Sequence, residues 1–198
     1  MALSNTHNLT IGHCNIQGGF TGISKSTQVS QLIGKHDLDI LSLNETNLNN
    51  TIDTNSLNIP SNYSFLRADR GKGTRGGCGF LISQQCAFDP ITINTNLDNI
   101  EAKWIKIKNS KIYVCGFYRS NGYCKLDNFL DYMNECMNKL KGKKVIWIGD
   151  INVDQNKINC PEYKKFDSAL NPYSPEPRKR QSFELIFCLK TSITLTKV

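Results

Sequence analysis

The sequence has no long apolar run and no export signal. Its 198 residues include nothing near the roughly 20 consecutive apolar residues that a membrane-spanning helix needs. The amino terminus, MALSNTHNLTIGHCN, lacks the charged start and the apolar segment of a signal peptide. We therefore expect an intracellular protein, nuclear or cytoplasmic and not secreted, with no membrane partner. The length suits one domain with its own core.

The eight cysteines include no C-x-x-C pair, which argues against a structural zinc site. Without an export signal they also meet no oxidising compartment in which to pair. Cys14 and Cys115 lie in apolar, strand-like runs. Because unpaired cysteine is among the most buried residue types, we expect buried free thiols rather than disulfides.

Acidic residues are in the minority. The chain carries 24 Lys and Arg against 17 Asp and Glu, for a net charge of +7. A basic balance favours polyanionic partners such as nucleic acid or an anionic membrane surface. On charge alone this indication is weak, because many basic proteins bind neither.

Hydrophobic patterning predicts an α/β sandwich in which strands outnumber helices. A helix of about three turns is expected around residues 29–36, and a longer apolar stripe at helical spacing covers 126–140. The expected strands are 9–16, 38–43, 63–67, 77–83, 88–93, 102–107, 112–118 and 145–148. Strands and helices in this mixture pack as layers around one core.

The segment VIWIGDIN ends an apolar strand with an acid and an amide. Gly149 allows close backbone approach, and strand alternation lets Asp150 and Asn152 face the same side. A carboxylate there can hold a hard divalent cation or orient a water, and an amide can hydrogen-bond a phosphate oxygen. The plain alternative is a turn, since Gly, Asp and Asn are common turn residues.

Three other strand ends are polar in the same way. They carry Asn15, Glu45 and Tyr118 in the segments LTIGHCNI, LSLNE and VCGFYRSN. Ligands of α/β proteins gather at strand termini, so we expect these side chains to converge with Asp150 and Asn152. Carboxylates, amides and a phenol suit metal-assisted phosphoryl chemistry.

The order of these motifs resembles the endonuclease/exonuclease/phosphatase superfamily. Within it, LDILSLNETNL and RADRGKGTRGGCGFLIS are most similar to the apurinic-type endonuclease domains of non-LTR retrotransposons, and the similarity covers about residues 9–155. The resemblance implies a DNase I-like two-sheet α/β sandwich. It also implies a metal-dependent DNA endonuclease that leaves a nick with a 3′-hydroxyl.

The resemblance also implies roles for the matching residues. Glu45, with Asn15, would bind Mg²⁺, for which Mn²⁺ is the alternative. Asn15 would also support the scissile phosphate, and Tyr118 would steady it. Asp150 would orient or deprotonate the attacking water, and Asn152 would hydrogen-bond the phosphate. The expected partner is DNA, and the protein is expected to be a monomer with no obligate protein partner.

Basic residues near this site fit a DNA partner. Each phosphate contact would make binding more dependent on salt. A solvated loop is the alternative for a bare cluster of charges, but the neighbouring site favours a role in binding. The expected DNA-binding residues are Arg67, Arg70, Lys72, Arg75, Arg119 and Asn121.

The resemblance stops before the carboxyl terminus. Relatives end in a Ser-Asp-His motif that completes the active site, and this chain has no such triplet. Its histidines, His7, His13 and His36, all precede Glu45, and we expect His13 and His36 to be structural. We therefore expect an endonuclease-like domain over 1–170 that is incomplete at its carboxyl end, and an irregular, degenerate tail over 171–198. Within this tail the run FELIFCL is apolar and strand-like.

Two other functions stay open at this point. The chain could be a catalytically silent remnant that at most binds DNA, because loss of a general acid or base costs about 10²–10⁴-fold in rate. It could also be a phosphatase of the same superfamily, acting on a small phosphorylated substrate or a lipid. That function would not need the RADRGKGTR loop.

Overall fold

The computed structural model describes residues 9–71, 75–95, 97, 99–120 and 122–153, and the backbone of 184–187 and 196–197. Within these residues, ten strands form two five-stranded sheets. The strands of the first sheet are, in order, β10 (Thr196–Lys197), β1 (Thr10–Asn15), β2 (Ile40–Asn44), β4 (Cys78–Ser83) and β3 (Tyr63–Ala68). Those of the second are β5 (Phe88–Ile91), β6 (Glu101–Ile107), β7 (Ile112–Tyr118), β8 (Lys144–Asp150) and β9 (Glu184–Phe187).

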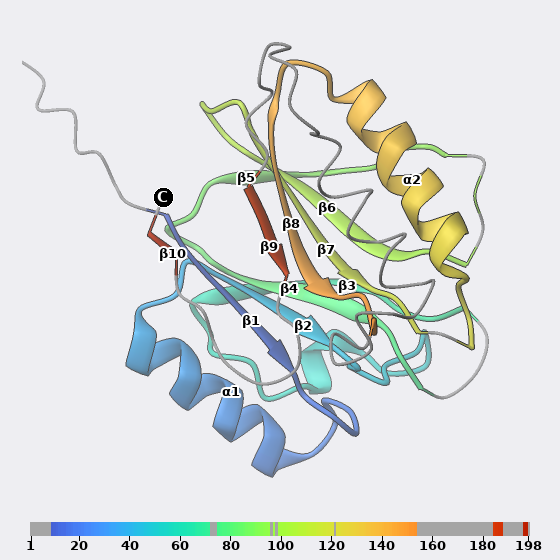
Figure 1. Cartoon of the computed structure of the whole chain (residues 1–198). Helices are drawn as coiled ribbons and strands as arrows, with labels where there is room; N and C mark the ends of the chain where they lie inside the picture. The colour runs from blue at the N-terminus through green and yellow to red at the C-terminus, as the bar shows by residue number, and fades with distance from the viewer. Residues whose placement is uncertain are drawn as a thin grey trace, which may run out of the picture.

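Both sheets are mixed and pack face to face. β1 runs parallel to β2, and β7, β8 and β9 are parallel to one another, while the other pairs are antiparallel. The arrowheads of β1, β2, β7 and β8 point toward the same end of the molecule (Figure 1). The predicted two-sheet α/β sandwich is therefore confirmed.

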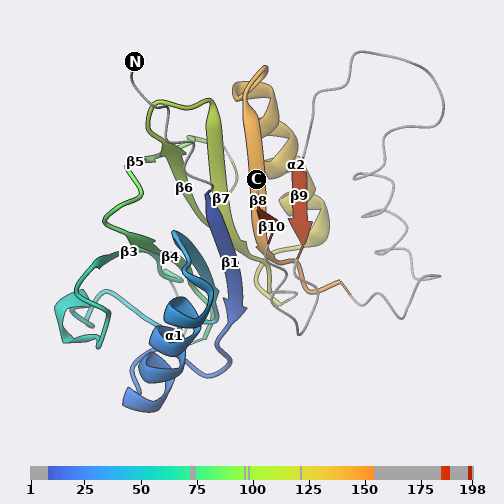
Figure 2. The ribbon, with the colours of Figure 1, turned by 90° about the vertical axis from the view of Figure 1, so that its left-hand side faces the viewer.

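A helix covers the outer face of each sheet. Helix α1 (Ile23–His36) packs on the first sheet and α2 (Leu126–Lys139) on the second, on opposite sides of the sandwich (Figures 1 and 2). A short 3-10 helix, η1 (Thr54–Ser56), lies between β2 and β3. Among the helices of the described ranges, none has the length and apolar character needed to cross a membrane.

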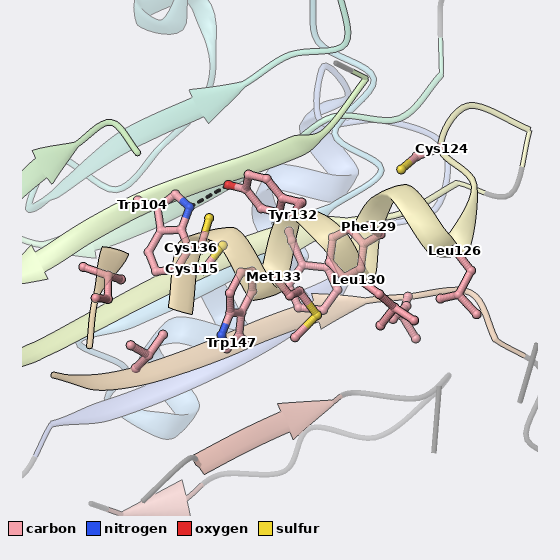
Figure 3. Close-up of a cluster of buried hydrophobic side chains, with 14 of the residues drawn as sticks. Trp104, Cys115, Cys124, Leu126, Phe129, Leu130, Tyr132, Met133, Cys136 and Trp147 are labelled. Atoms are coloured by element: carbon pink, nitrogen blue, oxygen red, sulfur yellow. Dashed lines mark hydrogen bonds between the residues drawn. The ribbon is translucent and has the colours of Figure 1, made fainter. Parts of the chain in front are cut away.

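Aromatic side chains form the core beneath α2. The rings of Trp104 and Trp147 meet edge to face with centroids 4.8 Å apart, and Phe129 packs against Phe117 at 4.9 Å. The Trp104 indole nitrogen donates a 2.7 Å hydrogen bond to the Tyr132 hydroxyl, so both polar groups are satisfied in the core (Figure 3). This cluster fixes α2 on the second sheet.

Most predicted elements are present, with differences at their ends. The first helix begins at Ile23, six positions before the predicted 29–36, because its first turns are polar and carry little apolar periodicity. The strand predicted over 145–148 continues to Asp150, which pairs with Tyr118 on β7. Within the tail, the run FELIFCL was expected to be strand-like, and 184–187 is a strand. Residues 196–197 also form a strand, where the sequence predicts an irregular segment; the rest of 171–198 lies outside the described residues.

The space between the sheets changes from apolar to polar along the strands. Alternate residues of β1, β2, β7 and β8 face this interior, and at one end they belong to an apolar cluster with Ile11, Ile40, Val114 and Ile146. Four positions further along each of these strands lie polar residues, and strand pairing adds one residue each from β4 and β6. We call this mainly polar set the site layer. It consists of Asn15, Asn44, Cys78, Glu101, Tyr118 and Asp150.

Gly149 sets the fit between β7 and β8, as the sequence predicts. A Cβ atom at this position would lie 1.9 Å from the carbonyl oxygen of Phe117, its partner in the strand pairing. Movement of a side chain cannot relieve this clash, because the obstructing atom belongs to the backbone. The contact keeps Asp150 opposite Tyr118, at the point where both side chains enter the site layer.

We expect Gly149→Ala to lower the free energy of unfolding by about 3 kcal/mol or more, since overpacking against backbone cannot relax. Gly34→Ala is the matched control. Its new Cβ would meet nothing within 4 Å in α1, so helix propensity should stabilise it by about 0.5–1 kcal/mol. Urea unfolding of both variants checks this, and similar midpoints for the two would contradict it.

Candidate active site

Asn15 joins the two sheets at the centre of the site. Its Nδ2 donates one hydrogen bond of 2.9 Å to Glu45 Oε1 and another of 3.3 Å to Asp150 Oδ2. The backbone N–H of Gln17 donates to Asn15 Oδ1 at 3.0 Å. That bond fixes the orientation of the amide, so its N–H groups face the two carboxylates.

Glu45 reaches the site through a strained backbone. It follows β2, where strand alternation would turn its side chain away from the site layer, but its φ of 57° lies in the left-handed region. A non-glycine residue there costs about 1–3 kcal/mol and is typical of functional sites. The turn lets Glu45 Oε1 accept hydrogen bonds from Asn15 and, at 3.1 Å, from the Tyr118 hydroxyl.

The Tyr118 hydroxyl is a hydrogen-bond donor at neutral pH. Its position in a partly buried site, next to the Glu45 carboxylate, raises the pKa of the phenol to about 12. Burial is the largest cause, followed by the negative charge of Glu45, with a smaller contribution from Asp150. The hydroxyl therefore stays protonated and donates to Glu45, and it can donate to an anionic ligand in the same way.

Asp150 and Asn152 form a tight turn after β8. The backbone N–H of Asn152 donates to Asp150 Oδ1 at 2.8 Å, and the Asn152 side chain donates to the Arg119 carbonyl at 2.8 Å. The strand ends at Asp150 and Asn152 has a φ of 52°, so a turn, and not strand alternation, orients the amide. The turn interpretation of this segment is therefore confirmed, and the site interpretation stays a prediction.

The donor set fits a hard divalent cation. Glu45 and Asp150 converge on one amide, and the hydrogen bonds described at Glu45 come from neutral donors, Asn15 and Tyr118. Two carboxylates so placed attract a cation and offer the oxygen ligands that Mg²⁺ and Mn²⁺ prefer. Asn15 turns its Nδ2 toward both carboxylates, and its Oδ1 accepts from the Gln17 N–H, so the amide orients the carboxylates in this structure. Its expected role as a metal ligand stays a prediction. No group of three or more His, Cys, Asp or Glu suited to a metal occurs in the described ranges.

Arg119 does not face the site, although it was expected to bind DNA. Its side chain is only 1% exposed, and its guanidinium donates to the carbonyls of Cys124 at 3.1 Å and Ile151 at 2.9 Å. A direct phosphate contact would need these bonds to break. Arg119 instead ties the loop after β7 to the turn that carries Asp150 and Asn152.

Two further arginines expected to bind DNA are held by internal partners. Arg67 forms a 2.6 Å ion pair with Asp69 and donates to the carbonyls of Asn49 and Ile52. Arg70 pairs with Glu101. Their positions in a glycine-rich, basic segment suggested free charges, because sequence does not reveal the tertiary partners of a guanidinium.

Of the three remaining expected DNA contacts, the structure describes one. Arg75 is exposed, beside Gly76 and Gly77 in the same loop. Lys72 and Asn121 lie outside the described residues. Arg75 is thus the expected contact whose described side chain is open to a ligand.

The described histidines lie apart from the site's hydrogen bonds. His13 is 5% exposed and faces Ser42 in the strand pairing, and burial lowers its pKa to about 4, so it is neutral at pH 7. His36 ends α1. Both therefore occupy structural positions, as expected, and His7 lies outside the described residues.

The cysteines that the structure describes are free, as expected. Five of the six are buried, and Cys14 is partly exposed. Burial raises the pKa of the Cys86 and Cys136 thiols to about 11. Cys160 and Cys188 lie outside the described residues.

Sequence reasoning missed Glu101. This residue begins β6, is 4% exposed and belongs to the site layer beside Tyr118. Its signal in the sequence is a single acid at the start of a strand that alternates lysines with apolar residues, which looks like an ordinary surface position.

Carboxylates, amides and a phenol at one end of a two-sheet sandwich are residue types that suit metal-assisted phosphoryl chemistry. A sequence profile of the endonuclease/exonuclease/phosphatase family matches residues 12–182. The chain belongs to this family, whose members are generally dependent on a divalent metal ion. No curated protein sequence matches the chain.

Solved structures share the fold. The endonuclease domain of TRAS1, a telomere-specific non-LTR retrotransposon, has a TM-score of 0.61 at 12% identity, over 83% of this chain and 70% of that one. The AP endonuclease LMAP from Leishmania major has 0.63 at 16%, over 83% and 66%. TDP2 from D. rerio, complexed with a single-strand DNA product, has 0.50 at 14%, over 77% and 64%. The chain thus spans about two thirds of the length of these proteins.

The Tyr118 phenol should respond to the Glu45 charge. Glu45→Gln removes that charge, so the pKa of Tyr118 should fall from about 12 but stay above 10, because burial remains the largest cause. Metal-free NMR titration of ring-labelled tyrosine, assigned with Tyr118→Phe, measures this. An unchanged pKa in Glu45→Gln would show that the two groups are not coupled.

The same shift predicts a loss of stability at high pH. The folded pKa of Tyr118 lies above the value of about 10 for an unfolded tyrosine. This phenol therefore contributes stability that is complete below pH 10 and is lost as the pH rises toward 12. Tyr118→Phe should weaken that dependence in urea unfolding series, and an identical dependence would refute the assignment.

Arg119→Ala should lower the free energy of unfolding by about 2–4 kcal/mol, because it leaves buried carbonyls without donors. The exposed Arg75→Ala should change stability by no more than about 0.5 kcal/mol. Thermal unfolding of the two variants makes the comparison. Equal effects would mean that Arg119 does not hold the loops as described.

Proposed function

We propose that this chain is a DNA endonuclease domain of the non-LTR retrotransposon type, which cuts one phosphodiester bond with the help of Mg²⁺ or Mn²⁺. The observation that carries the proposal is the single hydrogen-bonded cluster of Asn15, Glu45, Tyr118 and Asp150 in a member of this family. The likeness of the fold to the TRAS1 endonuclease domain and to a DNA-bound TDP2 supports it.

Each side chain has a role in the proposed reaction. Glu45 and Asp150 would hold the divalent cation, which would supply positive charge to neutralise the scissile phosphate. Asp150 also orients the attacking water and accepts its proton, while the Tyr118 hydroxyl donates a hydrogen bond to a phosphate oxygen. Asn15 keeps the two carboxylates in place. Asn152 lies next to Asp150, where its amide can hydrogen-bond the phosphate once its bond to the Arg119 carbonyl is exchanged.

The bond between phosphorus and the 3′ oxygen breaks in this reaction. The water oxygen bonds to phosphorus, and the departing 3′ oxygen takes up a proton, which leaves a 3′-hydroxyl and a 5′-phosphate. Binding energy from the DNA backbone positions the phosphate over Tyr118 and Asp150 before any bond changes.

Nicking of supercoiled plasmid by the purified full chain with Mg²⁺ tests the proposal. Glu45→Gln and Asp150→Asn keep side-chain volume but remove a charge, and each should slow nicking by at least about 10²-fold. Glu135→Gln, the same change on the exposed face of α2, should leave the rate unchanged, and EDTA should abolish nicking. A folded protein with no metal-dependent nicking would establish instead that the chain is a silent remnant.

Arg75 should contribute to DNA affinity through a phosphate contact. Arg75→Ala should reduce the slope of log affinity against log salt by about 0.9, the loss of one contact. Lys144→Ala, which removes an exposed charge where β8 begins and therefore at the far end from Asp150, should leave the slope unchanged. Fluorescence anisotropy of labelled duplex over a salt series measures both slopes. Equal slopes for the two variants would remove Arg75 from the interface.

A further inference from the structure

Arg70 and Glu101 form a buried ion pair next to the site. The Arg70 Nε donates to Glu101 Oε1, and the side chains are 13% and 3% exposed. The guanidinium also lies over the Tyr123 ring, 4.4 Å from its centroid, and packs against the backbone of Gly76. A buried ion pair adds little net stability compared with an apolar pair of the same shape, so stability alone does not account for it.

The second oxygen of Glu101 connects to the loop that carries Glu45. The Gly77 N–H donates to Glu101 Oε2 at 3.0 Å. The Gly77 carbonyl in turn accepts from the Thr46 N–H at 3.4 Å. Thr46 directly follows Glu45, so two hydrogen bonds connect the Glu101 carboxylate to the backbone beside the Glu45 side chain.

Two further hydrogen bonds connect Asn47 with Gly76. The Asn47 N–H donates to the Gly76 carbonyl at 2.8 Å, and the Gly76 N–H donates to Asn47 Oδ1 at 2.8 Å. Gly76 and Gly77 have φ values of 106° and 83°, and a Cβ at either would clash with Arg70 or Thr46. The two glycines therefore form a backbone bridge that only glycine fits.

Glu101 also adjoins Tyr118. The two residues are partners in the antiparallel pairing of β6 and β7. Glu101 is thus connected to both halves of the site. In the first sheet it is linked to the backbone beside Glu45 by the hydrogen bonds of Gly77 and Thr46. In the second sheet it pairs with Tyr118. Its partner Arg70 contacts Tyr123, in the loop that follows β7.

We propose that Glu101, held by Arg70, is a positioning residue that sets the placement of Glu45 relative to Tyr118 and Asn15. It acts through the Gly76–Gly77 bridge and does not touch the substrate. Its consequence for nicking rests on the proposed function, but its effect on site geometry does not. Misplacing a catalytic group by a fraction of an ångström lowers the rate of chemistry and leaves substrate binding largely intact.

The test uses the Asn15 side-chain amide, which donates to both Glu45 and Asp150, as a reporter of site geometry. In two-dimensional NMR of the metal-free full chain, Glu101→Gln and Arg70→Gln should shift the Asn15 NH₂ and Gly77 N–H resonances. Glu135→Gln, the same change in the exposed ion pair with Lys139, should shift neither. An unmoved Asn15 resonance in folded Glu101→Gln overturns the proposal.

A substitute variant and a kinetic measurement complete the test. If Glu101→Gln does not fold, Arg70→Lys, which keeps the charge but loses the planar contact with Tyr123, takes its place with the same criteria. If the wild-type chain nicks DNA, Glu101→Gln should lower kcat by about 10–100-fold and change KM by less than about threefold. A change confined to KM would contradict a positioning role. If the wild type does not nick, the proposed function fails while the NMR result still decides this proposal.

Discussion

One amide, that of Asn15, is shared by two carboxylates from different sheets. Glu45 follows a strand of the first sheet and Asp150 ends a strand of the second, and like charges so close would otherwise separate them. The Gln17 N–H settles which way the amide points. The rest of the site depends on this bond pair, because Tyr118 donates to the same oxygen of Glu45 and Asn152 folds back on Asp150.

The residues that stabilise the sandwich and those of the candidate site lie at different places along the strands. The apolar end of the inter-sheet core and the aromatic cluster under α2 hold the sheets together. The polar end of the sandwich then tolerates unfavourable features, which include the neighbouring carboxylates of Glu45 and Asp150 and the left-handed backbone at Glu45 and Asn152. Arginines compensate locally: Arg119 and Arg70 bind protein groups and brace the loops around the site. Arginines close to the site thus hold its loops in place.

The sequence was sufficient to predict which strand ends meet at the site. Polar residues at four apolar strand ends predicted the convergence of Asn15, Glu45, Tyr118 and Asp150, and Gly149 predicted close strand contact. It was not sufficient for Arg67, Arg70 and Arg119, because a guanidinium looks the same in sequence whether it meets a carbonyl or a phosphate. Glu101 was missed because the sequence does not reveal its tertiary partners, Arg70 and Gly77. The catalytic, DNA-binding and metal roles stay predictions.

The central claim is that the carboxylates joined by Asn15 form a divalent-cation centre. Anomalous diffraction from metal-free crystals soaked in Mn²⁺ tests it most directly. We expect a peak at about 2.2 Å from a Glu45 carboxylate oxygen, next to Asp150, that is lost in Glu45→Gln crystals. An ordered site with no peak at saturating Mn²⁺, or a peak that survives in Glu45→Gln, would contradict the account.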